Sequence, residues 1–134
     1  MSTEANKEVV KRTFTELWMP MGAGLAPELL APNYVRHWTV GPAGTDMAGI
    51  GAVQEAIAGF VAVFPDVQWT VEDLVGEGDR LACRFTGRAT RQGEFLGAPA
   101  DGKRVVIGGS VFYRFSGGKI TEDWTQLGVW DLPK

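Results

Sequence analysis

The stretch GGSVFYRFSGGKITEDWTQLGVWD, from Gly108 to Asp131, decides the fold. It predicts two strands joined at Gly117-Gly118, because tight hairpin turns need positive φ angles that glycine adopts at little cost. Successive side chains in a strand point to opposite faces. The odd-numbered face is mostly apolar but includes Asp123, which a symmetric turn places opposite Tyr113. A carboxylate on the core face of a sheet is costly unless it is paired or lies in a cavity, so Asp123 is the first candidate for function.

Length and composition predict one globular domain over residues 1–134, with 45% hydrophobic and 22% charged residues. The net charge of −3 and the lack of a basic run argue against nucleic acid as a partner. The sequence shows no signal-peptide core and no apolar run of membrane-spanning length. A single cysteine, Cys83, excludes an internal disulfide. We therefore expect a soluble cytoplasmic protein without a membrane partner.

Cofactors are not expected from the sequence. The chain has one histidine, His37, and no cluster of histidine, cysteine and carboxylate at ligand spacing, which argues against a metal. No glycine-rich loop has the context of a nucleotide-binding motif. We predict an enzyme or binding protein that works with no cofactor.

Hydrophobic periodicity predicts helices first and long strands later, an α+β order. The expected helices span residue 3 to about 19, 25–30 ended by Pro32, and about 47–64 with Thr45 or Asp46 as the cap. The expected strands cover 34–39, 66–75, 80–86, 104–115 and 119–130, and a protruding loop covers 91–103. A twisted antiparallel sheet of this length closes into a cone around a pocket, with the helices as its lid.

The residues also resemble a known family. The most specific pieces are Phe64-Pro65-Asp66, Glu77-Gly78-Asp79-Arg80, Gly93-Glu94-Phe95-Leu96-Gly97 with Pro99 and Gly102-Lys103, and Gly118-Lys119-Ile120. Over nearly the whole chain they look like the SnoaL-like polyketide cyclases of the NTF2-like superfamily. The resemblance implies an NTF2-like cone around an apolar pocket, a homodimer through the outer sheet face, and ring closure by an intramolecular aldol step without cofactor.

The family's catalytic positions differ in this chain. Aligned on Gly118-Lys119-Ile120, the cyclase aspartate corresponds to Thr125, and a catalytic histidine corresponds to Val111. Both positions share the odd face with Asp123. Asp123 could therefore replace the missing acid/base group, or it could only orient a ligand.

Two residues are the catalytic candidates, each with a structural alternative. Asp123 in an apolar cone could move a proton next to a carbonyl group, or it could be a structural aspartate bonded to Tyr113, Thr125 or a backbone amide. His37, expected at the pocket rim, could shuttle a proton or simply pack.

Aromatic side chains could form a flat slot for a ring-shaped ligand, although each could equally be ordinary core. The predicted substrate-binding residues are Trp18, Tyr34, Trp38, Phe60, Phe64, Trp69, Phe85, Phe95, Val111, Tyr113 and Thr125. Residues 93–98 could form a lid or a surface turn. The even face, with Phe112, Ile120 and Trp124, is apolar enough to predict a homodimer, or cover by residues 129–132.

Three functions follow, in order of preference. The first is a cofactor-independent acid/base enzyme, a cyclase or isomerase acting by aldol-type or enolisation chemistry on a small hydrophobic carbonyl or polyketide-like substrate. The second is a non-catalytic module that binds a small hydrophobic ligand. The third is an epoxide hydrolase or dehydratase, which needs a second acid, for which Asp73 is the one candidate on the face of Asp123. Fold alone does not decide among them.

Overall fold

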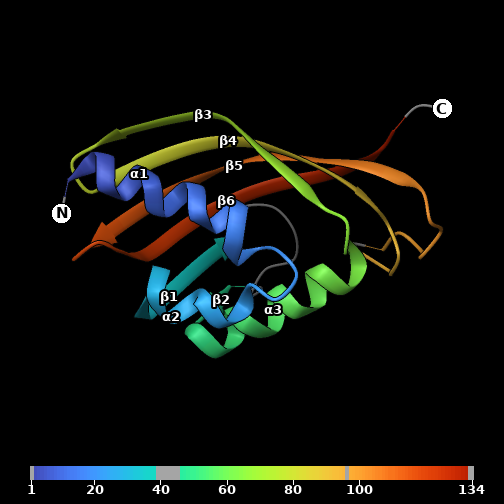
Figure 1. The fold of residues 1–134 in the computed structure, drawn as a ribbon, viewed down its shortest axis with the longest axis horizontal. Coiled ribbons are helices and arrows are strands. Elements are labelled where there is room, and N and C mark those ends of the chain that lie inside the picture. Colours follow the sequence, from blue (N-terminus) through green and yellow to red (C-terminus); the bar gives the residue numbers. More distant parts are fainter. Residues whose placement is uncertain (1, 39–45, 96, 133–134) are drawn as a thin grey trace.

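The computed structural model describes residues 2–38, 46–95 and 97–132. The helices are α1 (Thr3–Arg12), continued by a π-helical turn (Thr13–Leu17), then a 3₁₀ turn (Ala23–Leu25), α2 (Ala26–Leu29) and α3 (Ile50–Val63). The strands are β1 (Leu30–Trp38), β2 (Met47–Ala48), β3 (Gln68–Glu77), β4 (Arg80–Thr90), β5 (Arg104–Ser116) and β6 (Lys119–Asp131). The predicted α+β order is confirmed, with the long strands after the helices (Figure 1).

The described strands form one sheet in the order β2-β1-β6-β5-β4-β3. β3 to β6 are antiparallel neighbours, as predicted, but β1 runs parallel to β6. The predicted curved antiparallel sheet is therefore confirmed for β3 to β6, and the β1–β6 pair departs from it. Parallel neighbours need a long connection, and here most of the chain lies between β1 and β6.

A bulge in β6 brings Asp123 to the inner face. Close to the turn, Phe115 pairs with Ile120, whereas further along Tyr113 pairs with Asp123, so Thr121 is the extra residue. A bulge shifts the alternation of side chains by one position. The predicted pairing of Tyr113 with Asp123 is confirmed, but the placement of Ile120 on the outer face is wrong, because its side chain is fully buried in the core.

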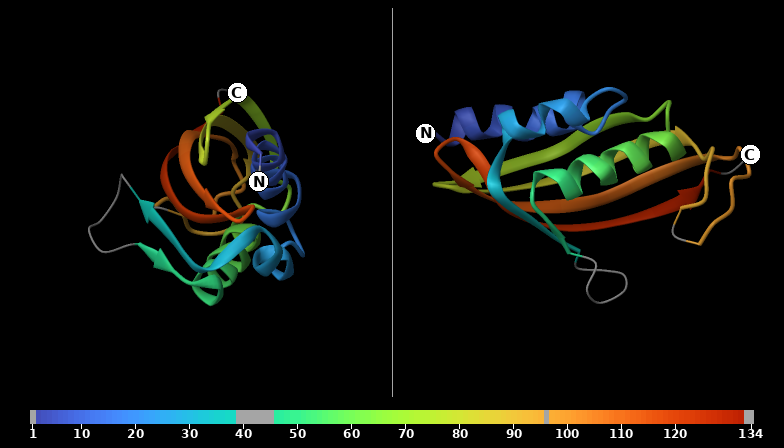
Figure 2. Two further views of the ribbon diagram at one scale, coloured as in Figure 1. Left: turned by 90° about the vertical axis from the view of Figure 1, so that its left-hand side faces the viewer. Right: turned by 90° about the horizontal axis from the view of Figure 1, so that it is seen from below.

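The sheet is strongly curved, and the helices close its open side. Seen end-on, the long strands curl around the interior while α1 and α3 lie across the gap (Figure 2). Gly109 permits this bend, because a Cβ atom there would lie 2.0 Å from the carbonyl oxygen of Gln126 on the neighbouring strand. The core lies between the concave face of the sheet and the helices.

Two element boundaries and the facing of one strand residue differ from the sequence prediction. α3 begins at Ile50 with Gly49 as its N-cap, because Met47 and Ala48 pair with β1, so neither Thr45 nor Asp46 caps it; Thr45 lies outside the described residues. Pro32 lies inside β1, at a break in the register with β6, where a missing N–H costs no ladder bond. A bulge in β3 between Val71 and Asp73 turns Val75 outward, and it is 63% exposed.

Across the described ranges, no helix combines the length and the apolar character that crossing a membrane requires.

Candidate functional site

A cavity of about 290 Å³ lies between the concave face of the sheet and the helices. Its walls come from the π-helical turn after α1 and the residue that follows it, from β1, α3 and β3 to β6, and from the loop after β4. The lining residues are mainly aromatic and aliphatic, and they are Thr13, Phe14, Trp18, Arg36, Trp38, Ala56, Gly59, Phe60, Trp69, Phe85, Phe95, Val111, Tyr113, Thr125 and Leu127. The cavity is close to the lower end of the size range of small-molecule sites.

Aromatic rings shape the walls. The rings of Phe60 and Trp69 are stacked, with centroids 5.6 Å apart, and Phe14 and Phe85 pack against Trp69 at steep angles. Trp69 can lie close to the sheet because Gly87, its partner on β4, has no side chain; a Cβ there would lie 2.6 Å from the indole ring. The rings therefore line an apolar space and do not fill it.

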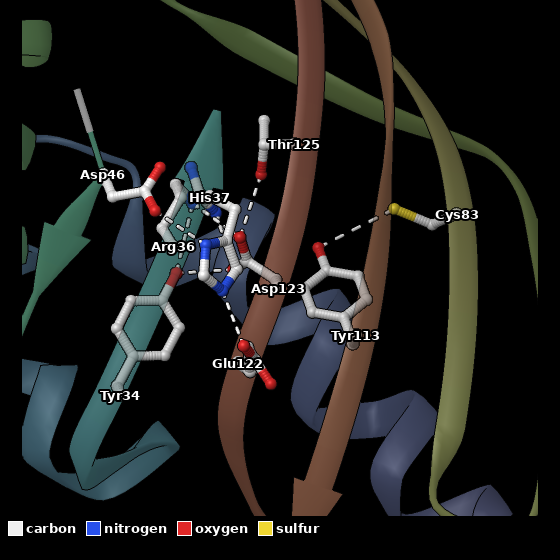
Figure 3. Close-up of polar contacts among 9 residues, drawn as sticks. All are labelled: Tyr34, Arg36, His37, Asp46, Cys83, Tyr113, Glu122, Asp123 and Thr125. Atoms are coloured by element: carbon white, nitrogen blue, oxygen red, sulfur yellow. Dashed lines mark hydrogen bonds and ion pairs between the residues drawn. The ribbon is translucent and has the colours of Figure 1, made fainter. Parts of the chain in front are cut away.

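Asp123 is buried behind the cavity wall rather than exposed in it. Its carboxylate is 1% exposed and accepts hydrogen bonds from Arg36 (Nε at 3.0 Å and Nη2 at 3.2 Å), from the Tyr34 hydroxyl (2.5 Å) and from the Thr125 hydroxyl (3.0 Å), as Figure 3 shows. Of the partners that the structural alternative named, Thr125 is present, and the main partner, Arg36, was not predicted. Asp123 is also absent from the cavity lining, which it reaches only through Arg36 and Thr125.

Arg36 is the positive charge of this cluster. Its guanidinium lies 4.9 Å from the ring centre of Trp18 and 5.7 Å from that of Trp38, within the range of cation–π contact. Burial is the largest single influence and lowers the pKa of Arg36, but attraction to Asp123 and Tyr34 and the hydrogen bonds to Asp123 together outweigh it, so the pKa of Arg36 is raised. The group therefore stays a cation at every physiological pH.

The two buried tyrosines stay neutral. Burial raises the pKa of Tyr34, whose hydroxyl also receives a hydrogen bond from Arg36 Nε at 3.1 Å. Burial raises the pKa of Tyr113 well above its usual value, and its hydroxyl lies 3.7 Å from the sulfur of Cys83, whose own pKa burial raises to about 11. Tyr113 and Thr125 thus offer hydroxyl groups, not charges, to the cavity.

His37 lies on the opposite face of the sheet from the cavity. It is next to Arg36 in β1 and therefore points outward, where its ring stacks on Trp124 at 5.3 Å. Its Nδ1 is 2.8 Å from Asp46 and its Nε2 is 2.5 Å from Glu122, which also pairs with Arg114. The expected position at the pocket rim is wrong, and His37 is a surface ion-pair residue in this structure.

This outer cluster predicts a pH dependence of stability. Hydrogen bonding to Glu122 and Asp46 raises the pKa of His37 above 6.5. The contribution of protonated His37 to folding stability is therefore fully present below pH 6.5 and is lost as the pH rises through the raised pKa. Hydrogen bonding to His37 lowers the pKa of Glu122 below 4.5. The contribution of ionised Glu122 to folding stability is therefore fully present above pH 4.5 and is lost as the pH falls through the lowered pKa. We expect this cluster to stabilise most between pH 4.5 and 6.5.

Urea unfolding at pH 5.5 and pH 8.5 measures this dependence. His37→Gln should reduce the difference in unfolding midpoint between the two pH values, whereas Asp73→Asn, at a surface pair elsewhere on the sheet, should not. An unchanged difference in His37→Gln would show that other groups cause it.

The predicted substrate-binding residues mostly come together. Nine of the eleven line the cavity: Trp18, Trp38, Phe60, Trp69, Phe85, Phe95, Val111, Tyr113 and Thr125. Phe64 is instead fully buried behind Phe60 and Phe95, and Tyr34 contacts Asp123 from behind the wall. Within the loop 93–98, Phe95 turns into the cavity and its backbone pairs with Ala98; Leu96 lies outside the described residues.

Six lining residues were missed by sequence reasoning: Thr13, Phe14, Arg36, Ala56, Gly59 and Leu127. The signal for Arg36 was present, because strand alternation places Tyr34, Arg36 and Trp38 on one face and His37 on the other. Asp73, the proposed second acid of a hydrolase, is exposed and paired with Arg84. No carboxylate lines the cavity in the part of the chain that the structure describes.

The arrangement offers hydrogen-bond donors to a guest. Arg36 and Tyr113 can each donate to an oxygen atom of a guest, while Asp123 orients Arg36 and accepts the hydroxyl hydrogen of Thr125 from behind. Over the described ranges, no group of three or more histidine, cysteine or carboxylate side chains could hold a metal ion. The chemistry open to these residues is stabilisation of a developing oxyanion together with short proton transfers.

Comparison with known proteins agrees with this picture. The sequence profile of the SnoaL-like polyketide cyclase family matches residues 8–132. A SnoaL-like polyketide cyclase from Agrobacterium tumefaciens has 23% identity and a TM-score of 0.78, with 96% of this chain and 93% of that chain covered. IdmH from Streptomyces antibioticus, a candidate polyketide cyclase, has 28% identity and a TM-score of 0.75, with 91% of both chains covered.

A third solved structure carries a different activity in its name. AclR from Streptomyces galilaeus, a candidate hydroxylase, has 26% identity and a TM-score of 0.77, with 95% of this chain and 81% of that chain covered. The search of curated proteins found no match. The curved sheet is thus the NTF2-like architecture that the sequence predicted, and the profile match over nearly the whole length shows the family. This chain belongs to the SnoaL-like polyketide cyclases.

Proposed function

We propose that the protein is a cofactor-independent cyclase or isomerase that enolises a small hydrophobic carbonyl compound. One observation carries the proposal: a buried guanidinium–carboxylate pair lies behind an apolar cavity and reaches it through Arg36 and Thr125. An ion pair with a purely structural role would not need residues that reach the cavity. The family match supports the same class of reaction.

Arg36 would stabilise the oxyanion. When a proton leaves the carbon next to a carbonyl, the electron pair moves toward the carbonyl oxygen. A fixed cation in a dry aromatic site favours that charge strongly, and one such donor typically contributes about 10²–10³-fold in rate. Tyr113 on β5, which β6 separates from β1, is a second, neutral donor.

Asp123 would receive the proton through Thr125. The Thr125 hydroxyl donates to Asp123, so its oxygen can accept a proton from the substrate carbon while its own proton passes to the carboxylate. The C–H electrons become the enolate double bond. In an isomerase the proton returns to a different carbon; in a cyclase the enolate carbon attacks a second carbonyl, and the resulting alkoxide takes the proton back.

Deuterium exchange of 2-tetralone tests this proposal without knowledge of the natural substrate. In D₂O the wild-type protein should accelerate exchange of the protons next to the carbonyl, as followed by NMR. Thr125→Val keeps the shape of the side chain but breaks the relay, and exchange should fall about 10²-fold or more. Thr13→Val removes a cavity hydroxyl that donates to the Val10 carbonyl instead, and its effect should be much smaller. Equal loss in both variants would contradict the relay.

A second candidate function is ligand binding without catalysis. It is favoured by one observation: both oxygens of Asp123 already accept hydrogen bonds, and neither lines the cavity. Binding of 2-tetralone with no acceleration of exchange would support this candidate over the enzyme.

We also propose a homodimer through the outer face of the sheet. A cross-strand row of Ala82, Phe112 and Trp124 lies there, and Phe112 is 43% exposed. Around this row the face carries both signs of charge, with Arg84 and Arg114 beside Asp73 and Glu122, as a self-complementary two-fold contact requires.

Phe112→Glu should convert the dimer to a monomer in sedimentation velocity. A wild-type monomer at micromolar concentration would contradict the proposal.

A further inference from the structure

The volume of the cavity limits the size of its guest. An apolar cavity of about 150 Å³ holds one benzene ring. The cavity here has about 290 Å³, twice that volume, so it accommodates about two fused rings with short substituents. Three or four fused rings would exceed it unless the walls moved.

The walls also limit the shape and polarity of the guest. The stacked pair of Phe60 and Trp69, with Phe14 and Phe85 beside it, presents flat apolar surfaces. Such surfaces favour a planar aromatic or conjugated molecule.

Charge selects the polar group of the guest. Arg36 is the one charged side chain in the lining formed by the described residues. Because no carboxylate lines this described wall, a buried ammonium group would have no counter-charge there. The wall instead offers the cation Arg36 and the neutral hydroxyl donor of Tyr113, a set that suits an anionic oxygen.

The geometry of Arg36 indicates how such a group would bind. Asp123 occupies the side-on edge of the guanidinium, formed by Nε and Nη2. The end-on edge, formed by Nη1 and the second hydrogen of Nη2, is not used in the hydrogen bonds of Arg36 to Asp123 and Tyr34. Two parallel donors on one edge match a planar group with two oxygen atoms.

We propose that the cavity takes a flat ligand of about two fused rings that carries one planar anionic oxygen group against the end-on edge of Arg36. This inference rests on the proposed function in so far as both use Arg36 to hold negative charge on oxygen, and it adds the size and the charge of the substrate. Amines of the same size are rejected.

Titration of the wild-type protein with four compounds tests the inference by quenching of tryptophan fluorescence, because Trp18, Trp38 and Trp69 line the cavity. The compounds are 2-naphthoate, its neutral isostere 2-naphthamide, the cation 2-naphthylmethylammonium and the larger anthracene-2-carboxylate. A hydrogen-bonded ion pair in place of a neutral contact should make 2-naphthoate bind about 10- to 100-fold more tightly than the amide. The cation and the three-ring acid should bind more weakly than 2-naphthoate.

Two variants test whether Arg36 causes the preference for the anionic ligand. Arg36→Lys keeps the charge but loses the planar fork, and should reduce the preference for 2-naphthoate over 2-naphthamide about 10-fold. Arg84→Lys, on the outer face, should leave the preference unchanged. If Arg36→Lys does not fold, the comparison of the four compounds on the wild-type protein still decides.

Three outcomes would overturn the inference: equal affinity for the acid and the amide, tightest binding of the amine, or tightest binding of the three-ring acid. These are distinct from failure of the proposed function. Tight binding of 2-naphthoate without exchange of 2-tetralone would refute the enzyme but not the ligand class. Exchange without preference for an anion would refute the ligand class but not the enzyme.

Discussion

Asp123→Leu is expected to destabilise the protein by about 3–5 kcal/mol, because it leaves Arg36 as a buried charge without its partner. Arg36→Met should have a similar effect, because it leaves the Asp123 carboxylate as a buried charge without its partner. The double variant Asp123→Leu/Arg36→Met should cost much less than the sum of the two, since apolar replacement of a whole buried pair is often close to neutral. Urea unfolding of the four proteins measures the coupling.

A surface pair provides the control for this cycle. Arg84 and Asp73 form an ion pair of similar length, but both side chains are more than half exposed. The same cycle there should give coupling below about 1 kcal/mol. Additive effects at Asp123 and Arg36 would contradict the description of the two residues as one buried pair.

Ala56→Phe is expected to abolish ligand binding and turnover while leaving the protein folded. Ala56 lines the cavity from α3, and because a cavity of roughly 150 Å³ holds one benzene ring, a phenyl ring there takes up about half of the available space. We expect 2-naphthoate affinity to fall at least 100-fold. Stability should stay the same or rise, because the ring fills an apolar space that is otherwise empty of protein.

Ala58→Phe is the matched control, since Ala58 is exposed on the same helix and does not line the cavity. The Ala58→Phe protein should bind 2-naphthoate and exchange 2-tetralone as the wild type does. If Ala56→Phe binds 2-naphthoate and exchanges 2-tetralone as the wild type does, the site lies elsewhere.

Much of the fold could be predicted because its signals are local. The glycine turn fixed the β5–β6 hairpin, helical periodicity located α1 and α3, and strand alternation assigned the inner face of β4. The predictions that failed within the strands did so because of bulges, in which one extra residue is inserted into a strand. A bulge at Thr121 moved Ile120 to the core, and a bulge in β3 turned Val75 to solvent. A bulge has no strong sequence signature, because its stability depends on the partner strand.

The site was predicted in outline but not in its electrostatics. Asp123 and Tyr113 are on the inner face as expected, but the partner of Asp123 comes from β1, a strand paired in parallel from the far end of the chain. Pairing over that distance is invisible to periodicity. The choice of both His37 and Trp38 as site residues also conflicted with alternation, since neighbours in a strand face opposite ways.

The most direct test of the central claim is the rate of deuterium exchange of 2-tetralone in wild type and in Asp123→Asn. We expect the wild-type protein to accelerate exchange and Asp123→Asn, checked for folding by circular dichroism, to lose at least 10²-fold of that acceleration. Exchange at the wild-type rate in a folded Asp123→Asn protein would contradict the claim that this carboxylate moves the proton.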